Sequence, residues 1–304
     1  MFTRVLFSIM KKNITQLYQD FCESKSIPFQ LDDKVSPYDD TTLFCPAGMQ
    51  QFKKKFSSDE TGTMANIQSC VRLKDLEEIG DGTHFLHFRM IGLFSFREMT
   101  LQTAVDFWME FIEQTLCLNV DYITIHPDKM EEWKYLYDNH DVEIREDDEC
   151  IWTDGEIGGY CTEFYHDDVE IGNIVNTVGT CIDVGFGLER LDALVNGQRQ
   201  YTKEDILKDA IVKMLDSGYY PSNKEQGYVL RKLLRELYFL SADWDNKHYR
   251  EEQKRQDKTV TRYEREKIKK KNQGKSKEWY WDTLGVDVDL VERIIKSRAV
   301  VTDE

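Results

Sequence analysis

The sequence predicts an α+β protein, in which a body of mixed helices and strands is followed by a helical C-terminal part. Aromatic residues make up 12% of the chain, whereas glycine and proline number only 17 and 5 among 304 residues, as in globular proteins with a large core. Helical and strand-like apolar patterns alternate up to about residue 197, and helical patterns dominate beyond it. We therefore expect two domains, residues 1–200 and residues 201–304.

Apolar periodicity indicates the elements of the body in turn. Residues 14–24 have the pattern of an amphipathic helix. Residues 100–117 give the strongest helical pattern, and Thr100 stands where its side chain can cap that helix. Short apolar runs predict strands at residues 122–125, 173–175 and 180–182.

The C-terminal part has two kinds of helical sequence. The leucines of residues 229–237 fall on one face of a predicted helix and the arginines on another. Residues 250–277 are almost entirely charged and polar, without an apolar stripe to bury. We expect that segment to be an exposed helix or a partly disordered arm.

The net charge of −16 is divided unevenly along the chain. Residues 1–220 carry 20 Lys and Arg against 40 Asp and Glu, a net of −20, and residues 221–304 carry 20 against 16, a net of +4. A phosphate backbone responds to local potential, so the basic C-terminal part is a candidate surface for nucleic acid. A solvated helical face is the alternative interpretation of such a charge run.

Cysteine use and hydropathy indicate the compartment. The seven cysteines are scattered and never in CxxC spacing, which favours reduced thiols in the cytoplasm over a disulfide framework or a zinc ribbon. No apolar run approaches the length of a membrane span, so we expect no membrane partner. The apolar first ten residues are too short for a secretory signal; a second start at Met10 and an organelle transit peptide are alternatives.

The segment from Asp183 to Arg190, with the sequence DVGFGLER, is the strongest functional motif. Its two glycines let the backbone approach a flat ligand closely, because neither carries a Cβ. Arg190 supplies a planar set of donors for phosphate oxygens. The preceding residues alternate like a buried strand, and we expect Asp183 to lie at the end of that strand and to point into a pocket.

A second candidate region is a predicted antiparallel hairpin. A strand-like segment ends at Arg72, a polar loop follows, and the chain returns through residues 84–96. Such a hairpin can hold Arg72 against a phosphate, although an isolated arginine is more often an ordinary surface residue. His84 and His87 have ligand-like spacing, but no further histidine or cysteine lies nearby in the sequence, so we expect no metal site there.

Two further residues suit a small pocket. Trp152 precedes a glycine-rich turn at residues 155–159, although a tryptophan is more often part of a core. Asn173 stands inside an apolar strand, where its amide is either structural or directed at a polar ligand.

In their order along the chain and in their residues, these segments resemble the alanyl-tRNA synthetases, a family of class II aminoacyl-tRNA synthetases. Residues 42–53 are similar to the family's first conserved block, residues 70–96 to its second motif and residues 183–190 to its third. Residues 221–231 and 280–285 resemble blocks of its tRNA-recognition region. The resemblance implies an antiparallel sheet flanked by helices, which carries the aminoacylation site, and a helical tRNA-recognition domain.

The resemblance also implies roles for single residues. Arg72 would hold the α-phosphate of ATP, and Arg190 the γ-phosphate and one face of adenine, as the catalytic pair. The remaining ATP-binding residues would be His84, Trp152, Ile171, Gly172 and Gly187. The amino acid would be bounded by Trp152 and Asn173, with Asp183 paired to its ammonium group. The tRNA acceptor stem would be contacted by Asn223, Arg231 and Asp282.

The sequence also departs from the family's pattern. The hairpin loop after Arg72 is shorter, Arg89 stands where the family has Glu, Phe85 where it has a nucleotide-contacting His, and Gly172 where it has Trp. Nothing in the sequence resembles the family's editing domain or its oligomerising region. We therefore expect a minimal, monomeric form that also activates some serine and glycine.

The function expected from this resemblance is that of an alanine–tRNA ligase. Such an enzyme uses ATP and Mg²⁺ to form alanyl-adenylate and then transfers alanine to the 3′ end of tRNA(Ala). Two alternatives stay open. One is a paralogue that activates a small amino acid for a non-tRNA acceptor, and the other is a catalytically inactive RNA-binding homologue.

Overall fold

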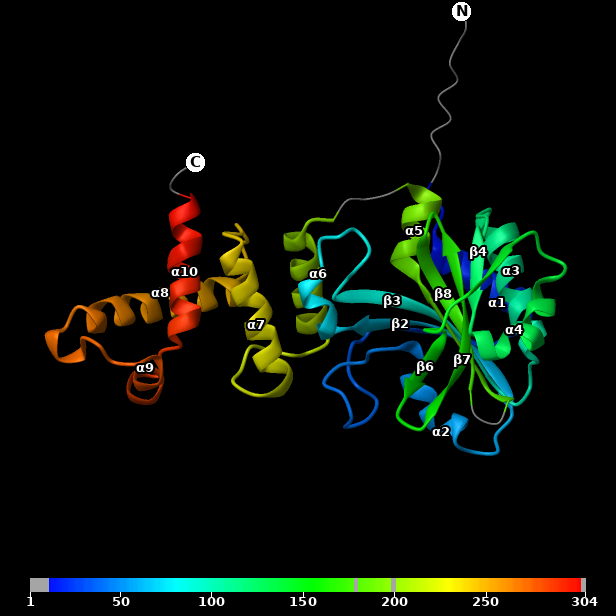
Figure 1. Cartoon of the computed structure of the whole chain (residues 1–304), viewed down its shortest axis with the longest axis horizontal. Coiled ribbons are helices and arrows are strands. Elements are labelled where there is room, and N and C mark those ends of the chain that lie inside the picture. Colours follow the sequence, from blue (N-terminus) through cyan, green and yellow to red (C-terminus); the bar gives the residue numbers. More distant parts are fainter. Residues whose placement is uncertain (1–10, 178–179, 198–200, 302–304) are drawn as a thin grey trace, which may run out of the picture. The chain divides into compact units, whose positions relative to one another are not determined.

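The computed structural model describes residues 11–177, 180–197 and 201–301. Internal contacts divide the chain into two compact units, Met1–Gln200 and Tyr201–Glu304. Figure 1 shows a sheet with its helices in the first unit and only helices in the second. The fold is therefore α+β, and each unit is described by itself.

One sheet of nine strands organises the first unit. Along the sheet the strand order is β1-β2-β3-β9-β8-β7-β4-β5, and β6 pairs with β7 outside this path. The central pairs are antiparallel, whereas β1–β2 and β4–β5 at the two edges are parallel. The strands are β1 Phe29–Asp32, β2 Gly62–Val71, β3 His87–Phe96, β4 Tyr122–Ile125, β5 Glu143–Glu146, β6 Ile151–Asp154, β7 Ile157–His166, β8 Val169–Asn176 and β9 Ile182–Gly187.

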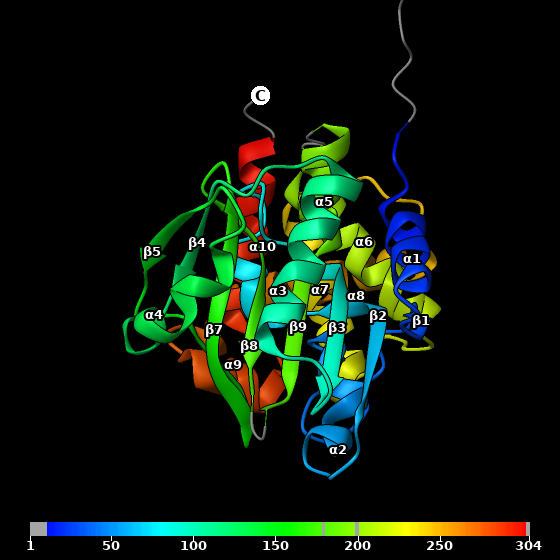
Figure 2. The same cartoon turned by 90° about the vertical axis from the view of Figure 1, so that its right-hand side faces the viewer.

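Helices cover one face of this sheet. They include α1 (Ile14–Ser24), α3 (Leu101–Glu110) and α5 (Leu188–Asn196), and Figure 2 shows α3 and α5 over the central strands. The core between them and the sheet is aromatic: Trp108 of α3 stacks on Tyr18 at 5.5 Å and on Phe186 of β9 at 4.2 Å. Because Phe186 belongs to the glycine motif, this stack anchors the motif to the core.

Short helical segments complete the first unit. These are α2 (Lys53–Phe56), α4 (Pro127–Trp133), the 3₁₀ turns Gly48–Phe52, Leu73–Glu77 and Lys134–Tyr137, and the π-helical turn Phe111–Leu116. A smaller apolar cluster includes Phe52 and Phe56 from this group, packed with Phe94 of β3.

Most predicted elements of the body are confirmed, with two differences. The helix at residues 14–24 and the strand at residues 122–125 have the predicted bounds, and Thr100 caps α3 by accepting a bond from the Thr103 amide. The helix predicted at residues 100–117 ends at Glu110, and a π-helical turn replaces its last part. The strand predicted at residues 180–182 begins only at Ile182, because Thr180 is left-handed with φ 62°.

The second unit contains the helices α6 (Lys203–Asp216), α7 (Glu225–Phe239), α8 (Lys247–Lys267), α9 (Lys277–Leu284) and α10 (Val288–Val301). The prediction that residues 250–277 have nothing to bury is wrong for α8. That helix buries a stripe spaced at three and four residues, formed by Tyr249, Glu252, Gln256, Val260, Tyr263 and Glu266. A hydropathy pattern misses this stripe because three of its six members are polar and two are tyrosines.

Two further properties concern the apolar helices and the cysteines. Within the part of the chain that the structure describes, no helix is long and apolar enough to cross a membrane. All seven cysteines are free, and six of them are buried.

Candidate active site

A cleft of about 810 Å³, counted with its opening to solvent, lies in the first unit. The cleft brings together all the residues of the body that were predicted to bind ATP or the amino acid: Arg72, His84, Trp152, Ile171, Gly172, Asn173, Asp183, Gly187 and Arg190. Their individual roles remain predictions.

Strand β9 positions the motif by alternation. Asp183, Gly185 and Gly187 line the cleft, whereas Ile182, Val184 and Phe186 belong to the core. This is the two-residue period of a strand, whose successive side chains point to opposite faces. The expectation that the strand ends at Asp183 is wrong, since β9 continues to Gly187 and carries the whole glycine pair. The cleft therefore lies on the face of the sheet opposite the helices.

Among the two predicted phosphate ligands, Arg72 is the one without a carboxylate partner in the described part of the chain, whereas Arg190 pairs with Glu170. Its Nε donates to the Pro46 carbonyl at 3.0 Å, and its guanidinium carbon lies 4.9 Å from the centroid of the Phe88 ring. No carboxylate in the described part of the chain forms an ion pair with it. The carbonyl and the ring fix the plane of the guanidinium, which leaves its positive charge for a ligand.

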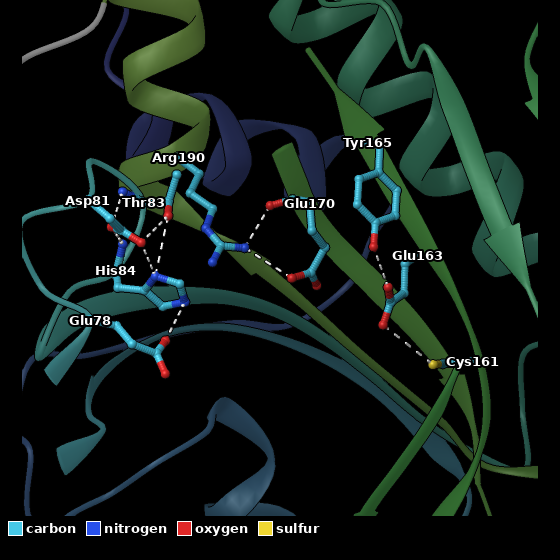
Figure 3. A network of polar contacts seen from close by, with 9 residues as sticks. All are labelled: Glu78, Asp81, Thr83, His84, Cys161, Glu163, Tyr165, Glu170 and Arg190. Carbon is cyan, nitrogen blue, oxygen red and sulfur yellow. Dashed lines mark hydrogen bonds and ion pairs between the residues drawn. The ribbon is translucent and has the colours of Figure 1, made fainter. Parts of the chain in front are cut away.

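Arg190 is already paired. Its Nη1 donates to the backbone carbonyl of Glu170 at 2.6 Å and to the Glu170 carboxylate at 3.0 Å, as Figure 3 shows. Arg190 projects from α5 and Glu170 from β8, and both line the cleft. A phosphate that binds Arg190 must therefore compete with Glu170.

Arg89, which stands where the family has Glu, pairs with a residue of the motif Asp183–Arg190. The Arg89 backbone amide and Nε donate to the two carboxylate oxygens of Glu189, at 2.9 Å and 3.0 Å. Glu189 lines the cleft beside Arg190. This pair joins β3 to the start of α5, and it uses the Glu of the motif as a structural acceptor.

The loop between β2 and β3 carries His84 to the cleft. Its Nδ1 lies 2.5 Å from an Asp81 carboxylate oxygen, and its Nε2 lies 3.2 Å from the Glu78 carboxylate. Figure 3 shows the ring held between these two acidic side chains. Both partners belong to the same loop, so His84 also stabilises the loop's conformation.

Asp183 has the most unusual environment in the cleft. The residue is 7% exposed, and among the described residues its carboxylate has no hydrogen bond and no cation. Burial, with a smaller contribution from the charge of Asp154, raises the pKa of Asp183 from 3.8 to about 7. Asp154 itself is paired with Lys53 at 3.0 Å. An unpaired buried carboxylate of this kind is a binding site for a cationic group of a ligand.

Trp152 and Asn173 line the cleft with Asp183. Trp152 lies on β6 and is half-buried, and Asn173 lies opposite Gly185 in the pairing of β8 with β9. Among the described residues, the Asn173 amide has no hydrogen-bond partner. The sequence left open whether this amide is structural or directed at a ligand, and its position in the cleft favours the ligand.

Gly172 is required by the packing behind the cleft. A Cβ at this position would lie 2.2 Å from Cγ of Phe186 and 2.6 Å from the carbonyl oxygen of Gly185. A larger residue would therefore displace Phe186 from its stack on Trp108. Gly172 can contact a ligand only through its backbone.

The three predicted tRNA-binding residues lie in the second unit and are only partly brought together. Arg231 of α7 donates through Nη1 to the Asn223 side chain and forms an ion pair with Glu252 of α8 at 3.2 Å. Asp282 lies on α9, where it is exposed. The Arg231 charge is thus largely neutralised by Glu252, which is 3% exposed.

Sequence reasoning assigned no role to several residues that line the cleft. They are Ala47, Asp75, Thr83, Phe85, Phe88, Met90, Glu170 and Glu189. Some of them reach the site only through strand pairing, which the sequence does not contain. For example, Met90 is opposite Gly187 in the pairing of β3 with β9.

The family model for tRNA synthetases class II (A) matches residues 13–177, more than half of the chain. The chain therefore belongs to this family. The match includes the hairpin with Arg72, the strand with Trp152 and all of β8.

Curated proteins similar to this chain include alanine–tRNA ligases. The chain is 28% identical over 277 residues to the alanine–tRNA ligase of Endomicrobium trichonymphae, covering 67% of this chain and 32% of that protein. It is 29% identical over 268 residues to the enzyme of the same name from Wolbachia pipientis wMel, covering 66% and 31%. The chain spans about a third of the length of these relatives.

Two solved structures show a weak overall likeness. The pyrrolysyl tRNA synthetase of Desulfitobacterium hafniense aligns with a TM-score of 0.39 at 12% identity, covering 64% of this chain and 71% of that one. Histidyl-tRNA synthetase of S. aureus aligns with a TM-score of 0.41 at 10% identity, covering 81% and 82%.

Proposed function

We propose that this chain is an alanine–tRNA ligase that activates alanine with ATP and transfers it to tRNA(Ala). The buried, unpaired Asp183 is the observation that best supports a ligand with an ammonium group. It lines the same cleft as Arg72 and Arg190, which suit phosphate oxygens. An amino acid and a nucleotide triphosphate together satisfy both kinds of site.

The activation step uses positioning rather than a protein nucleophile. An oxygen of the alanine carboxylate attacks the α-phosphorus of ATP, and the bond from that phosphorus to the α,β-bridging oxygen breaks to release pyrophosphate. Arg72 would stabilise the charge that develops on the α-phosphate, and Asp183 would hold the alanine ammonium. In the transfer step, the 3′-terminal hydroxyl of tRNA attacks the carbonyl carbon and AMP leaves.

Mg²⁺ fits this site on the chemistry of its lining. Glu170, Glu189 and Asp75 line the cleft, and carboxylate oxygens are the protein ligands that Mg²⁺ prefers. The ion would offset phosphate charge when ATP is bound. Glu170 is the strongest candidate ligand, because its present partner, Arg190, also has a role predicted towards phosphate.

Alanine is proposed over larger amino acids because Trp152 and Asn173 line the cleft with Asp183. A pocket discriminates one methylene by about 1–3 kcal/mol, or roughly 10–200-fold. We therefore expect weaker but measurable activation of glycine and serine.

ATP–pyrophosphate exchange with single amino acids tests the activation step, followed by acyl transfer to tRNA(Ala). We expect exchange to be strongest with alanine and to be lost in Asp183→Ala. Asp59→Ala is the matched control, because Asp59 is an exposed carboxylate outside the cleft. Exchange without transfer would instead support a paralogue with a non-tRNA acceptor. No exchange with any amino acid would sink the ligase proposal and leave an RNA-binding homologue.

A further inference from the structure

Two buried thiols and one carboxylate gather beside the cleft, on residues that the proposed reaction does not use. Cys150 precedes β6, and Cys161 and Glu163 lie on β7. Their sulfur and carboxylate oxygen atoms all lie within 4.8 Å of one another. The two cysteines are 0% and 1% exposed. The cluster is therefore a compact set of three ligand atoms away from bulk solvent.

The backbone holds this cluster in place. The Cys161 amide donates to the Cys150 carbonyl at 2.9 Å, which fixes the two residues opposite each other across the hairpin of β6 and β7. Glu163 is opposite Thr124 of β4 and Asn173 of β8. Since residues opposite one another share a face of the sheet, Glu163 and Thr124 lie on the cleft face with Asn173.

The Glu163 carboxylate is oriented for a ligand. The Tyr165 hydroxyl donates to Oε2 at 2.7 Å, and Oε1 faces the Cys161 sulfur at 4.0 Å. Figure 3 shows the carboxylate between these two side chains. A hydrogen bond that fixes one oxygen and directs the other is the usual outer support of a metal ligand.

The charges around the cluster favour a cation. No Lys, Arg or His forms an ion pair with Glu163 within the described residues. Asp147, Glu149 and Glu170 add negative potential at its carboxylate. On the other side, the Thr124 hydroxyl lies 3.0 Å from the Cys150 sulfur and adds another oxygen.

We propose that Cys150, Cys161 and Glu163 bind one Zn²⁺ ion. Two sulfur ligands select a soft divalent ion such as Zn²⁺ over Mg²⁺. Three ligand atoms this close need only small side-chain adjustments to converge at the usual 2.0–2.3 Å from one ion. Binding replaces the two thiol protons, which are released to solvent. The site has three protein ligands and a fourth position for water or Thr124.

The ion would stabilise the amino-acid end of the cleft. Cys150 is two residues before Trp152, and Glu163 is paired in register with Asn173. The ion would therefore link β7 to the segment that carries Trp152. This inference does not depend on the proposed ligase activity.

Cobalt substitution in the reduced, metal-free full chain is the test. Co²⁺ bound to thiolates gives a charge-transfer absorption that Co²⁺ on oxygen ligands does not. We expect this absorption to saturate at one Co²⁺ per chain and to disappear on addition of Zn²⁺. Cys150→Ala and Cys161→Ala should abolish it, and Cys117→Ala, at the exposed cysteine outside the cluster, should retain it.

A second pair of variants keeps the test decisive if the cysteine variants do not fold. Tyr165→Phe should weaken Zn²⁺ binding by roughly tenfold or more, because the carboxylate loses its outer support. Glu163→Gln should weaken binding further while the thiolate absorption persists. The proposal is wrong if the reduced wild-type chain gives no thiolate absorption, or if Cys150 and Cys161 only form a disulfide on oxidation and never hold metal. It is also wrong if folded cysteine variants bind as tightly as the wild type.

Discussion

Asp183 carries a proton at a pH where most carboxyl groups have lost theirs. Its pKa of about 7 follows first from burial and then from the nearby charge of Asp154. A bound ammonium group needs the ionised carboxylate. Amino-acid binding is therefore linked to loss of the Asp183 proton.

This linkage predicts the pH dependence of amino-acid binding. Below about pH 7 the raised pKa keeps Asp183 neutral, so the affinity for alanine should fall by about tenfold for each pH unit below that value. The KM for alanine in ATP–pyrophosphate exchange, measured from about pH 6 to about pH 8, should decrease and then level off. Asp183→Asn should have a high KM without this dependence, and Asp59→Asn should keep the wild-type profile. A wild-type KM that does not change with pH would contradict the raised pKa.

For single residues, the sequence predicted which side chains line the cleft but not which partners they pair with. Asp183, Asn173 and Trp152 line one cleft, as expected from their motifs. The Arg190–Glu170 pair and the Cys150–Cys161 pair were not predicted, since their members are 20 and 11 residues apart. Only the pairing of β8 with β9 and of β6 with β7 brings each pair together.

At the scale of elements, α7 and α8 meet through a charged contact. Arg231 of α7 pairs with Glu252, which is 3% exposed on the buried stripe of α8. Arg255 supplies a second cation to the same carboxylate at 3.3 Å. A buried carboxylate depends strongly on such partners, because it has lost its contact with water.

Arg231→Ala is therefore expected to destabilise the second unit by about 3 kcal/mol, since it leaves Glu252 buried with only Arg255. Urea unfolding of the full chain gives the change, and faster amide exchange in α7 and α8 should localise it. Lys232→Ala, at the exposed neighbouring position, should change the unfolding free energy by less than about 0.5 kcal/mol. An equally small effect of Arg231→Ala would show that the pair does not stabilise the unit.

Helices and strands were predicted correctly where apolar residues repeat at regular spacing within one segment of the chain. The helix at residues 14–24 is confirmed because its apolar residues repeat at helical spacing. The stripe on α8 was missed because its polar members are buried through polar partners: Glu252 pairs with Arg231 of α7, and Gln256 donates to Glu252 at 2.6 Å. A hydropathy pattern contains no information on such partners.

At the scale of the whole molecule, the two compact units suggest a division of labour. The cleft with Asp183 belongs entirely to the first unit, and Asn223, Arg231 and Asp282 belong to the second. Under the proposed function, activation needs the first unit's residues, and tRNA transfer also needs those of the second.

Asp282→Ala tests this division. Asp282 is exposed on α9, so its removal should leave folding and ATP–pyrophosphate exchange unchanged. Acyl transfer to tRNA(Ala) should fall by about tenfold or more, because one contact to a base edge contributes about 1–3 kcal/mol. Thr283→Ala, at the next exposed position of the same helix, should transfer at the wild-type rate. Equal loss of exchange and transfer in Asp282→Ala would argue against separate roles.

The alternation along β9 also has a consequence for how this chain tolerates insertions and deletions. One residue gained or lost between Asp183 and Gly187 would reverse the faces of the residues on one side of the change, so Asp183, Gly185 and Gly187 would no longer all line the cleft. The loop between β2 and β3 has no such constraint, since its length can change while the two strands stay paired. The number of residues in β9 is therefore fixed by the geometry of the sheet, whereas the number in the loop between β2 and β3 can vary. The shortening relative to the family falls in this loop.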